Sequence, residues 1–345
     1  MQTCIKCGLP EKYTGIKFDK SGKCNYCNFY EENKSFMEDE DLLEQKFLER
    51  IEKAKKKAKE NNSKYDCLVG FSGGKDSTYI IYQLKYKYHM RVLAFTFDNG
   101  FMTDYGKNNI KNALEKINVD HILFSPNEKK LKKQYAVCYK MLKNFCAVCF
   151  HNMHYYSYLF AHQNNIPMIV NGRTVGQILQ RADKKDGIEP FEVCDNLLDF
   201  ENQMFHGLEK SAEKLWNIDY LREIKGIESV SYFAYHKISE EETRSFLEEK
   251  INWQRPKGVS GHADCFGHIM AEYVSMKKNG FPLRTGELAV LVRIGEMTLE
   301  EAQKELSKDI DNFEEISYET KQQFYGTIGI RGERNDKMLC AGCGG

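Results

Sequence analysis

The clearest chemistry in this 345-residue sequence lies in one short segment, Ser72-Gly73-Gly74-Lys75-Asp76-Ser77. Its two glycines allow a tight turn that brings backbone N–H groups close to an anion. A helix expected to follow directs its positive end toward the same place. Lys75 adds a positive charge, the serine hydroxyls donate hydrogen bonds, and the Asp76 carboxylate suits Mg²⁺ bound to phosphate. We therefore predict a phosphate-binding loop with Lys75, Asp76 and Ser77 as catalytic residues; the alternative is a glycine turn that only begins a helix.

Four cysteines near the N-terminus have the spacing of a metal site. They follow the pattern Cys4-x2-Cys7-x16-Cys24-x2-Cys27, which is typical of tetrahedral zinc held by four thiolates. A module of about 30 residues has too little apolar surface to fold without such a crosslink. Because all four positions are filled by protein, we predict structural Zn²⁺; the alternative is four unrelated free thiols.

A second group of cysteines lies further along the chain, as Cys146-Ala-Val-Cys149 and a single Cys265. Three thiolates can hold a [4Fe–4S] cluster and leave one iron open. A second zinc site and a buried pair without metal are the alternatives. Cys265 alone would be read as a small core residue, and only its pairing with the other two makes it a candidate ligand.

The remaining cysteines and the histidines near them have no clear function in the sequence. Cys340 and Cys343 stand in a glycine-rich tail and cannot complete a zinc site by themselves. We interpret three further cysteines and four histidines as packing or surface residues: Cys67, Cys138, Cys194, His151, His154, His262 and His268.

The elements that position these groups are visible as apolar runs of strand length alternating with segments of helical length. The runs are 65–71, 91–98, 119–125 and 167–172, and 221–235 adds a further candidate strand. This alternation predicts an α/β fold, with a parallel sheet covered by helices on both faces. Ligands of such sheets bind beyond the C-terminal ends of the strands, where Asp98 and Arg173 stand. Arg173 suits a phosphate or substrate contact, whereas Asp98 is either a nucleotide contact or a turn residue.

These patterns divide the chain into five parts. They are a zinc-binding module (1–36), a connecting helix (37–62), a phosphate-loop domain (63–195), a mostly helical substrate region (196–330) and a Cys/Gly-rich tail (331–345). The connecting helix is indicated by apolar residues at helical spacing, with acidic residues early and lysines late.

The strand YDCLVGF followed by SGGKDS resembles the pyrophosphate-loop (PP-loop) ATPase superfamily, whose fold is of the adenine-nucleotide α-hydrolase type. The resemblance implies that Ser72–Ser77 bind the pyrophosphate of ATP with Mg²⁺ and that Asp98 meets the adenosine. It also implies the reaction: a substrate carbonyl oxygen attacks the α-phosphate, pyrophosphate leaves, and a nitrogen or sulfur nucleophile then displaces AMP. The domain at 63–195 is then an ATP-binding domain.

Within that superfamily the chain is most similar to the N-acetyl sugar amidotransferases of surface-polysaccharide biosynthesis. The similarity rests on CIKCGLP, GIKFDKSGKCNYC, FDNGF, NIPMIVNGR and GELAVLVRIGEMTLEEAQKEL, in that order. It implies transfer of ammonia from a partner glutaminase to an acetamido sugar. Gln2 follows Met1, so the chain has no N-terminal nucleophile of a glutaminase of its own.

The second cysteine group instead resembles the PP-loop tRNA thiolases, in which three cysteines hold a [4Fe–4S] cluster. Sulfur transfer to tRNA or a small molecule is therefore the alternative function, and a non-catalytic nucleotide-binding protein is a third. Fifty basic and fifty acidic residues give a net charge of zero, which favours a small substrate over tRNA.

The composition also bears on location. The sequence has no signal peptide and no apolar run long enough for a bilayer, and twelve cysteines without an export signal indicate a reducing compartment. We expect a cytoplasmic protein with no membrane association. The transferred atom, the substrate and the oligomeric state stay open.

Overall fold

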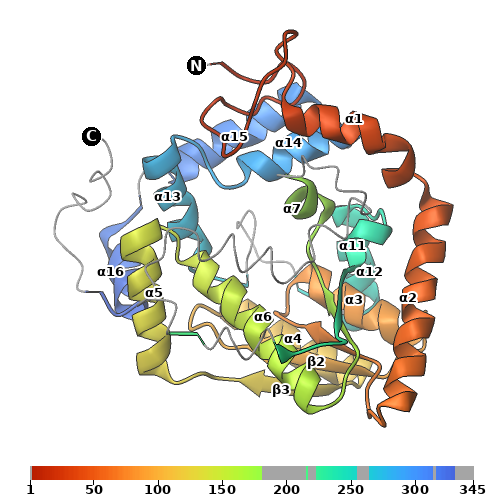
Figure 1. The fold of residues 1–345 in the computed structure, drawn as a ribbon. Coiled ribbons are helices and arrows are strands. Elements are labelled where there is room, and N and C mark those ends of the chain that lie inside the picture. The colour runs from red at the N-terminus through yellow and green to blue at the C-terminus, as the bar shows by residue number, and fades with distance from the viewer. Residues whose placement is uncertain (1, 181–214, 217–222, 255–263, 314–315, 331–345) are drawn as a thin grey trace.

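The sheet that carries the phosphate loop has five parallel strands in the order β3-β2-β1-β4-β5 (Figure 1). The computed structural model describes residues 2–180, 215–216, 223–254, 264–313 and 316–330. The strands are β1 (Cys67–Gly70), β2 (Val92–Phe97), β3 (Asp120–Phe124), β4 (Met168–Asn171) and β5 (Glu228–Ser231). Each lies within an apolar run predicted to be a strand, so the predicted α/β fold with a parallel sheet is confirmed.

The strand order follows from the chain path and places a binding crevice. β2 and β4 are buried along their whole length, as expected for strands covered on both faces. In the centre, Leu68 of β1 pairs with Leu93 of β2 on one side and with Ile169 of β4 on the other. The chain runs outward from β1 to β3 and then crosses to β4 and β5. The loops after β1 and β4 therefore diverge, and ligands bind at such a switch point.

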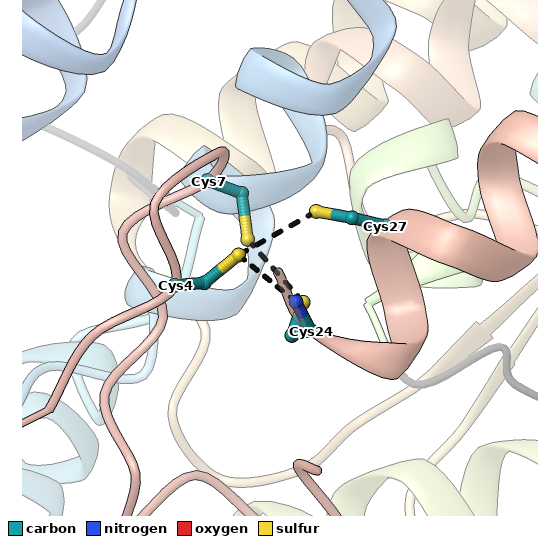
Figure 2. A group of neighbouring side chains, drawn as sticks. All are labelled: Cys4, Cys7, Cys24 and Cys27. Carbon is teal, nitrogen blue, oxygen red and sulfur yellow. Dashed lines mark hydrogen bonds between the residues drawn. The ribbon is translucent and has the colours of Figure 1, made fainter. Parts of the chain in front are cut away.

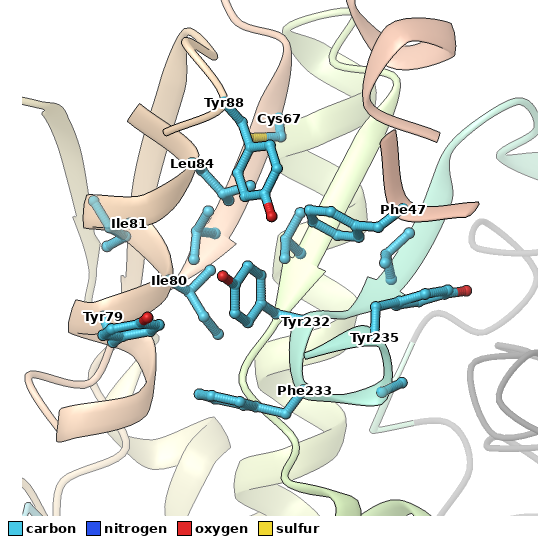
Figure 3. Packing of buried hydrophobic residues seen from close by; sticks show 14 of the residues in the cluster. Phe47, Cys67, Tyr79, Ile80, Ile81, Leu84, Tyr88, Tyr232, Phe233 and Tyr235 are labelled. Carbon is cyan, nitrogen blue, oxygen red and sulfur yellow. The ribbon is translucent and has the colours of Figure 1, made fainter. Parts of the chain in front are cut away.

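One face of the sheet is covered by α3 (Lys75–Tyr86) and α4 (Asp104–Ile117). Outside them lie α2 (Glu40–Glu60), α11 (Tyr232–Tyr235) and α12 (Glu240–Ile251). Figure 3 shows how Phe47 of α2 packs among Tyr88, Tyr232 and Tyr235. Tyr79 of α3 packs against Tyr232 and Phe233 in the same group, and this connects the helix that begins at the phosphate loop to α11.

The opposite face is covered by α6 (Cys146–Gln163), which contacts β1, β2 and β4. Beside it lie α5 (Glu128–Leu142), α13 (His268–Asn279) and α16 (Tyr318–Thr327). Phe101, Phe145 and Phe324 form the buried centre of this layer. Because α6 leads into β4, it runs opposite to the strands and begins at the C-terminal edge of the sheet, so Cys146 and Cys149 lie at that edge.

The N-terminal cysteine module packs against C-terminal helices. It leads into α1 (Asn25–Met37) and contacts α14 (Thr285–Ile294) and α15 (Leu299–Phe313), near α7 (Val175–Leu179) in Figure 1. The sequence did not predict α1. The connecting helix predicted at 37–62 is α2, and it begins only at Glu40 because the Asp39 side chain accepts a hydrogen bond from Leu42 N–H and caps it. None of the helices in the described part of the chain has the length and apolar character needed to cross a membrane.

Candidate functional site

The phosphate loop, Ser72–Ser77, follows β1 and continues into the first turn of α3 at the switch point of the sheet. Gly74 is the N-cap of α3 and has no side chain to cap it. The Gly74 N–H is donated to Ser72 Oγ at 3.2 Å, and the Ser72 N–H is donated to Ser77 Oγ at 3.3 Å. Thr78 Oγ1 donates to the Gly74 carbonyl at 2.8 Å. The loop is thus a closed turn of hydroxyls and amides at a helix N-terminus, which is suited to an anion.

Gly73 cannot be replaced in this turn without moving its neighbours. Its φ is +77°, in the left-handed region. A Cβ at this position would lie 2.3 Å from the Gly106 carbonyl oxygen and 2.9 Å from Ile110 of α4. The close approach of α4 therefore requires glycine, and it holds the loop against a rigid helix.

A buried tryptophan from a distant segment closes the loop from the other side. Trp253 Nε1 donates to the Gly73 carbonyl at 3.0 Å. The next residue, Gln254, donates its N–H to Asn109 Oδ1 at 3.1 Å. These bonds connect the end of α12 to the loop and to α4. The sequence analysis did not identify Trp253, and no local pattern marks it.

Because the chain has two tryptophans, this contact gives a direct reporter. Trp216 Nε1 also donates one buried hydrogen bond, to Asn152 Oδ1 of α6 at 2.9 Å, but Trp216 belongs to a different core cluster from Trp253. We expect Mg²⁺ with ATP or pyrophosphate to change the fluorescence of Trp216→Phe protein, in which Trp253 alone emits. The fluorescence of Trp253→Phe protein should not change in the same titration, although each variant loses a comparable hydrogen bond worth about 1 kcal/mol. A ligand response from Trp216 alone would contradict this placement of Trp253.

The charged residues of the loop form a compact group. Lys75 Nζ lies 2.8 Å from both carboxylate oxygens of Asp76. A second carboxylate, that of Asp264, lies against Gly74: a Cβ on Gly74 would be 3.3 Å from Asp264 Oδ2. The Asp264 carbonyl is held by Thr103 N–H at 3.0 Å. Sequence reasoning missed Asp264, although the neighbouring Cys265 was a candidate. Two carboxylates beside a phosphate loop are the oxygen ligands that Mg²⁺ prefers.

Arg173 and Asp98 lie at the same edge of the sheet but face other partners. Arg173 Nη2 donates to the Gln177 carbonyl at 3.3 Å, and its guanidinium lies 5.9 Å from the centre of the Phe150 ring on α6. Asp98 accepts hydrogen bonds from Gly100 N–H at 3.0 Å and from Ser125 Oγ at 3.1 Å. Asp98 thus makes turn contacts, the alternative considered for it, while a role in nucleotide binding stays a prediction.

The second cysteine group is brought into one neighbourhood. Cys149 Sγ lies 2.8 Å from Tyr135 Oη. The backbone of Cys265 forms an isolated antiparallel β-bridge with Met102, just beyond β2. Burial raises the pKa of the Cys149 thiol to about 11. Burial, followed by the charge of Cys149, raises the pKa of Cys265 to about 12. Burial also raises the pKa of Cys146, and the charges of Cys149 and Cys265 add to the rise. Without a bound cation, therefore, these thiols are neutral at pH 7.

A buried glutamate adjoins this group and should make stability depend on pH. Glu272 is 1% exposed and accepts the Leu283 N–H at 2.7 Å. Burial, with help from the charges of Asp309 and Glu287, raises its pKa to about 7. The folded state then keeps a proton that the unfolded state has lost, so stability falls as pH rises from about 4.5 to 7.

Glu272→Gln should remove this dependence, because the amide oxygen still accepts the Leu283 N–H but does not ionise. Relative to the variant, wild type is expected to lose about 2 kcal/mol between pH 5 and pH 8, from the size of the pKa shift. Urea unfolding of both proteins at the two pH values measures the difference. Equal pH dependence in both would contradict the assignment.

The four N-terminal cysteines form a tight group (Figure 2). Their ligand atoms all lie within 4.8 Å of one another and all four residues are buried. Sγ of Cys4 lies 3.8 Å from Sγ of Cys27, and Sγ of Cys7 lies 3.7 Å from that of Cys24. Hydrogen bonding from Cys24 and Cys27, with help from the Arg293 charge, lowers the pKa of Cys7 to about 7.

This donor set fits one tetrahedral metal ion with no open position. Zinc and iron both suit four thiolates. Among the described residues, it is the one set of three or more potential ligands that is gathered this closely.

The other singled-out residues divide by location. Cys67 and Cys138 are buried in the two core clusters, as expected of packing residues. Burial lowers the pKa of both His151 and His154 to about 3, and His268 lies 3.6 Å from Glu272. Cys194, His262, Cys340 and Cys343 lie outside the described residues.

Comparison with known proteins gives a distant relative and several solved structures of low similarity. No protein-family model matches the chain. An uncharacterized protein of Methanocaldococcus jannaschii is 24% identical over 265 residues, covering 76% of this chain and 80% of that protein.

Among solved structures, the U34-tRNA thiolase NcsA of Methanococcus maripaludis with its [4Fe–4S] cluster is similar over 100% of this chain and 97% of its own, at 15% identity and a TM-score of 0.38. The NH3-dependent NAD synthetase of Campylobacter jejuni is similar over 79% and 97%, at 12% identity and 0.36. The NMN synthetase of Francisella tularensis is similar over 64% and 99%, at 14% identity and 0.30. At such TM-scores these similarities assign neither a family nor a reaction, and the site itself has to support the function.

Proposed function

We propose that this chain cleaves ATP to AMP and pyrophosphate in order to activate a substrate carbonyl oxygen. The observation that supports this best is the closed loop at the switch point, with Asp264 beside Gly74 and with Asp76 between Lys75 and Gly172, the residue that follows β4. In the proposal, the loop amides and serine hydroxyls bind the departing pyrophosphate and Lys75 neutralises its charge. Asp76 and Asp264 would hold Mg²⁺, which would supply positive charge for the departing pyrophosphate. The carbonyl oxygen attacks the α-phosphorus, and the bond to pyrophosphate breaks.

The nucleophile that then displaces AMP is proposed to be ammonia, with an N-acetyl sugar as the substrate. The support is the resemblance of the cysteine module, the phosphate loop and the segment 286–306 to sugar amidotransferases, together with a net charge of zero. A partner glutaminase supplies the ammonia in this proposal. In such a protein the N-terminal metal site is structural, since its four thiolates leave no open position.

A second candidate is sulfur transfer to tRNA or a small molecule. It is favoured by one specific observation: Cys149 lies close enough to Cys146 and Cys265 for its charge to raise the pKa of both, and Cys265 follows Asp264, which lies against Gly74 of the phosphate loop. Soft thiolates of this kind suit an iron–sulfur cluster with three protein ligands. The chain's own residues would hold such a cluster at the edge of the sheet where α6 begins.

Metal analysis after anaerobic purification separates the two candidates. Amidation predicts no acid-labile sulfide and no iron beyond the one ion that the four-thiolate site can hold, with AMP formation that requires ammonia and a nucleotide-linked N-acetyl sugar. Thiolation predicts iron and sulfide that are lost in Cys265→Ala but kept in Cys138→Ala, which removes a buried thiol from the same core. Binding of ATP without turnover, with either ammonia or sulfide present, would favour the third hypothesis, a nucleotide-binding protein without catalysis.

A further inference from the structure

Arg293 is a buried cation in the last turn of α14, beside the N-terminal cysteine module. The residue is 5% exposed. Its Nη2 lies 3.9 Å from Cys7 Sγ, its Nη1 donates to the Leu179 carbonyl at 3.1 Å, and its guanidinium lies 5.6 Å from the centre of the Tyr26 ring. The buried Nε has no hydrogen-bond partner among the described residues.

A buried guanidinium needs a counter-charge, because an unpaired charge in a protein interior is strongly destabilising. Four thiolates around a divalent ion carry a net charge of about −2, whereas four protonated thiols carry none. The metal-loaded site therefore supplies the negative charge that Arg293 needs. Removal of the metal takes away this fixed group of four thiolates, and the guanidinium then lies beside sulfur atoms that carry less negative charge.

The other hydrogen bond of Arg293 reaches the end of α7, the helix that follows Arg173 and the switch-point strand β4. Two more contacts join the module to the same place. Tyr13 Oη donates to Gln180 Oε1 at 3.1 Å. A Cβ on Gly286 of α14 would lie 2.2 Å from Tyr13 Oη, so the module, α14 and α7 meet without room for another atom.

We propose that Arg293 is a positioning residue that couples metal loading of the cysteine module to the position of α7. Nη2 of its guanidinium contacts Cys7 Sγ of the module, and Nη1 donates to the carbonyl of Leu179 at the C-terminal end of α7. Loss of the metal removes the counter-charge, Arg293 leaves its buried position, and α7 loses its anchor. The module thereby stabilises the segment 172–179, whose first residue, Gly172, lies against Asp76 and Ser77 of the phosphate loop. The module itself makes no part of that loop.

The test uses the full-length protein loaded with Zn²⁺ and two measurements that involve no ATP. One is the rate at which zinc passes to a chromogenic chelator, and the other is amide hydrogen exchange in residues 174–180. We expect Arg293→Gln to release zinc at least about tenfold faster than wild type, as is usual when an outer-shell partner of a metal site is lost. Exchange in 174–180 should rise to the level of chelator-treated wild type.

Two further variants keep the test interpretable. Arg293→Lys retains the charge but not the two-sided fork, so it should retain zinc better than Arg293→Gln while exchange in 174–180 still rises. Arg284→Gln is the matched control: Arg284 precedes α14 and pairs with Asp309 instead of thiolates, so both readouts should equal wild type. Wild-type zinc release in Arg293→Gln, or unchanged exchange in 174–180 after chelation of wild type, would overturn the proposal. Either result would leave the proposed ATP chemistry untouched.

Discussion

Gly73→Ala is expected to lower ATP turnover about a hundredfold and to destabilise the protein. The new Cβ would lie 2.3 Å from the Gly106 carbonyl oxygen, which belongs to the backbone of α4 and cannot turn away. The left-handed φ of +77° adds about 1 kcal/mol or more of strain for any other residue. The loop must therefore move by an ångström or so, which costs catalysis about a hundredfold even without loss of any functional group. Turnover of ATP and urea unfolding measure the two effects.

Gly280→Ala is the matched control for this variant. Gly280 caps α13 with a φ of +81°, and a Cβ there meets no heavy atom within 4 Å. The control therefore carries the same backbone strain, about 1 kcal/mol, without the clash and away from the phosphate loop. Its turnover should equal wild type. The account of the loop would be wrong if Gly73→Ala kept wild-type turnover or if both variants lost it equally.

Cys24→Ser is expected to lose the bound metal and to lower the free energy of unfolding by at least about 3 kcal/mol, because binding of a structural metal contributes directly to folding. The effect should extend beyond the N-terminus. Leu288 and Val292 of α14 and Ala302 of α15 share one buried cluster with the cysteines, so unfolding of the module exposes the C-terminal helices as well. Metal content per chain and thermal unfolding measure the result.

The control is Cys138→Ala, which removes a fully buried thiol of the other core cluster. That variant should keep a full equivalent of metal and lose about 1 kcal/mol, the ordinary effect of a small core truncation. One equivalent of metal retained by Cys24→Ser would contradict the four-thiolate assignment. So would a wild-type protein that binds no metal when purified in its presence.

The parts of this fold that the sequence predicted are those set by local pattern. β1, β2 and β4 are short apolar runs, because buried strands of a parallel sheet need apolar side chains on both faces. The cysteine module was predictable because both knuckles have the spacing of a zinc site, and the structure gathers all four thiols. The helix α1 was missed because it begins inside the second knuckle, between Cys24 and Cys27.

The contacts that complete each site were not predictable, because they join residues far apart in the chain. Trp253 bonds Gly73 across 180 positions, and Arg293 reaches Cys7 across 286. Neither residue belongs to a short motif, so only the packing of α12 and α14 identifies them. Asp264 shows the same limit: it stands next to a candidate ligand, yet its proximity to Gly74 depends on how the segment after residue 263 lies along residues 101–103.

Identification of the products of ATP tests the central claim most directly. Wild type and Asp76→Asn are incubated with ATP, Mg²⁺ and the acceptors named above, with ammonia or sulfide, and the nucleotides are separated. We predict AMP and pyrophosphate in equal amounts from wild type and none from Asp76→Asn, because the Asp76 carboxylate is the proposed Mg²⁺ ligand at the loop. Formation of ADP and orthophosphate, or AMP formation undiminished in Asp76→Asn, would contradict the account.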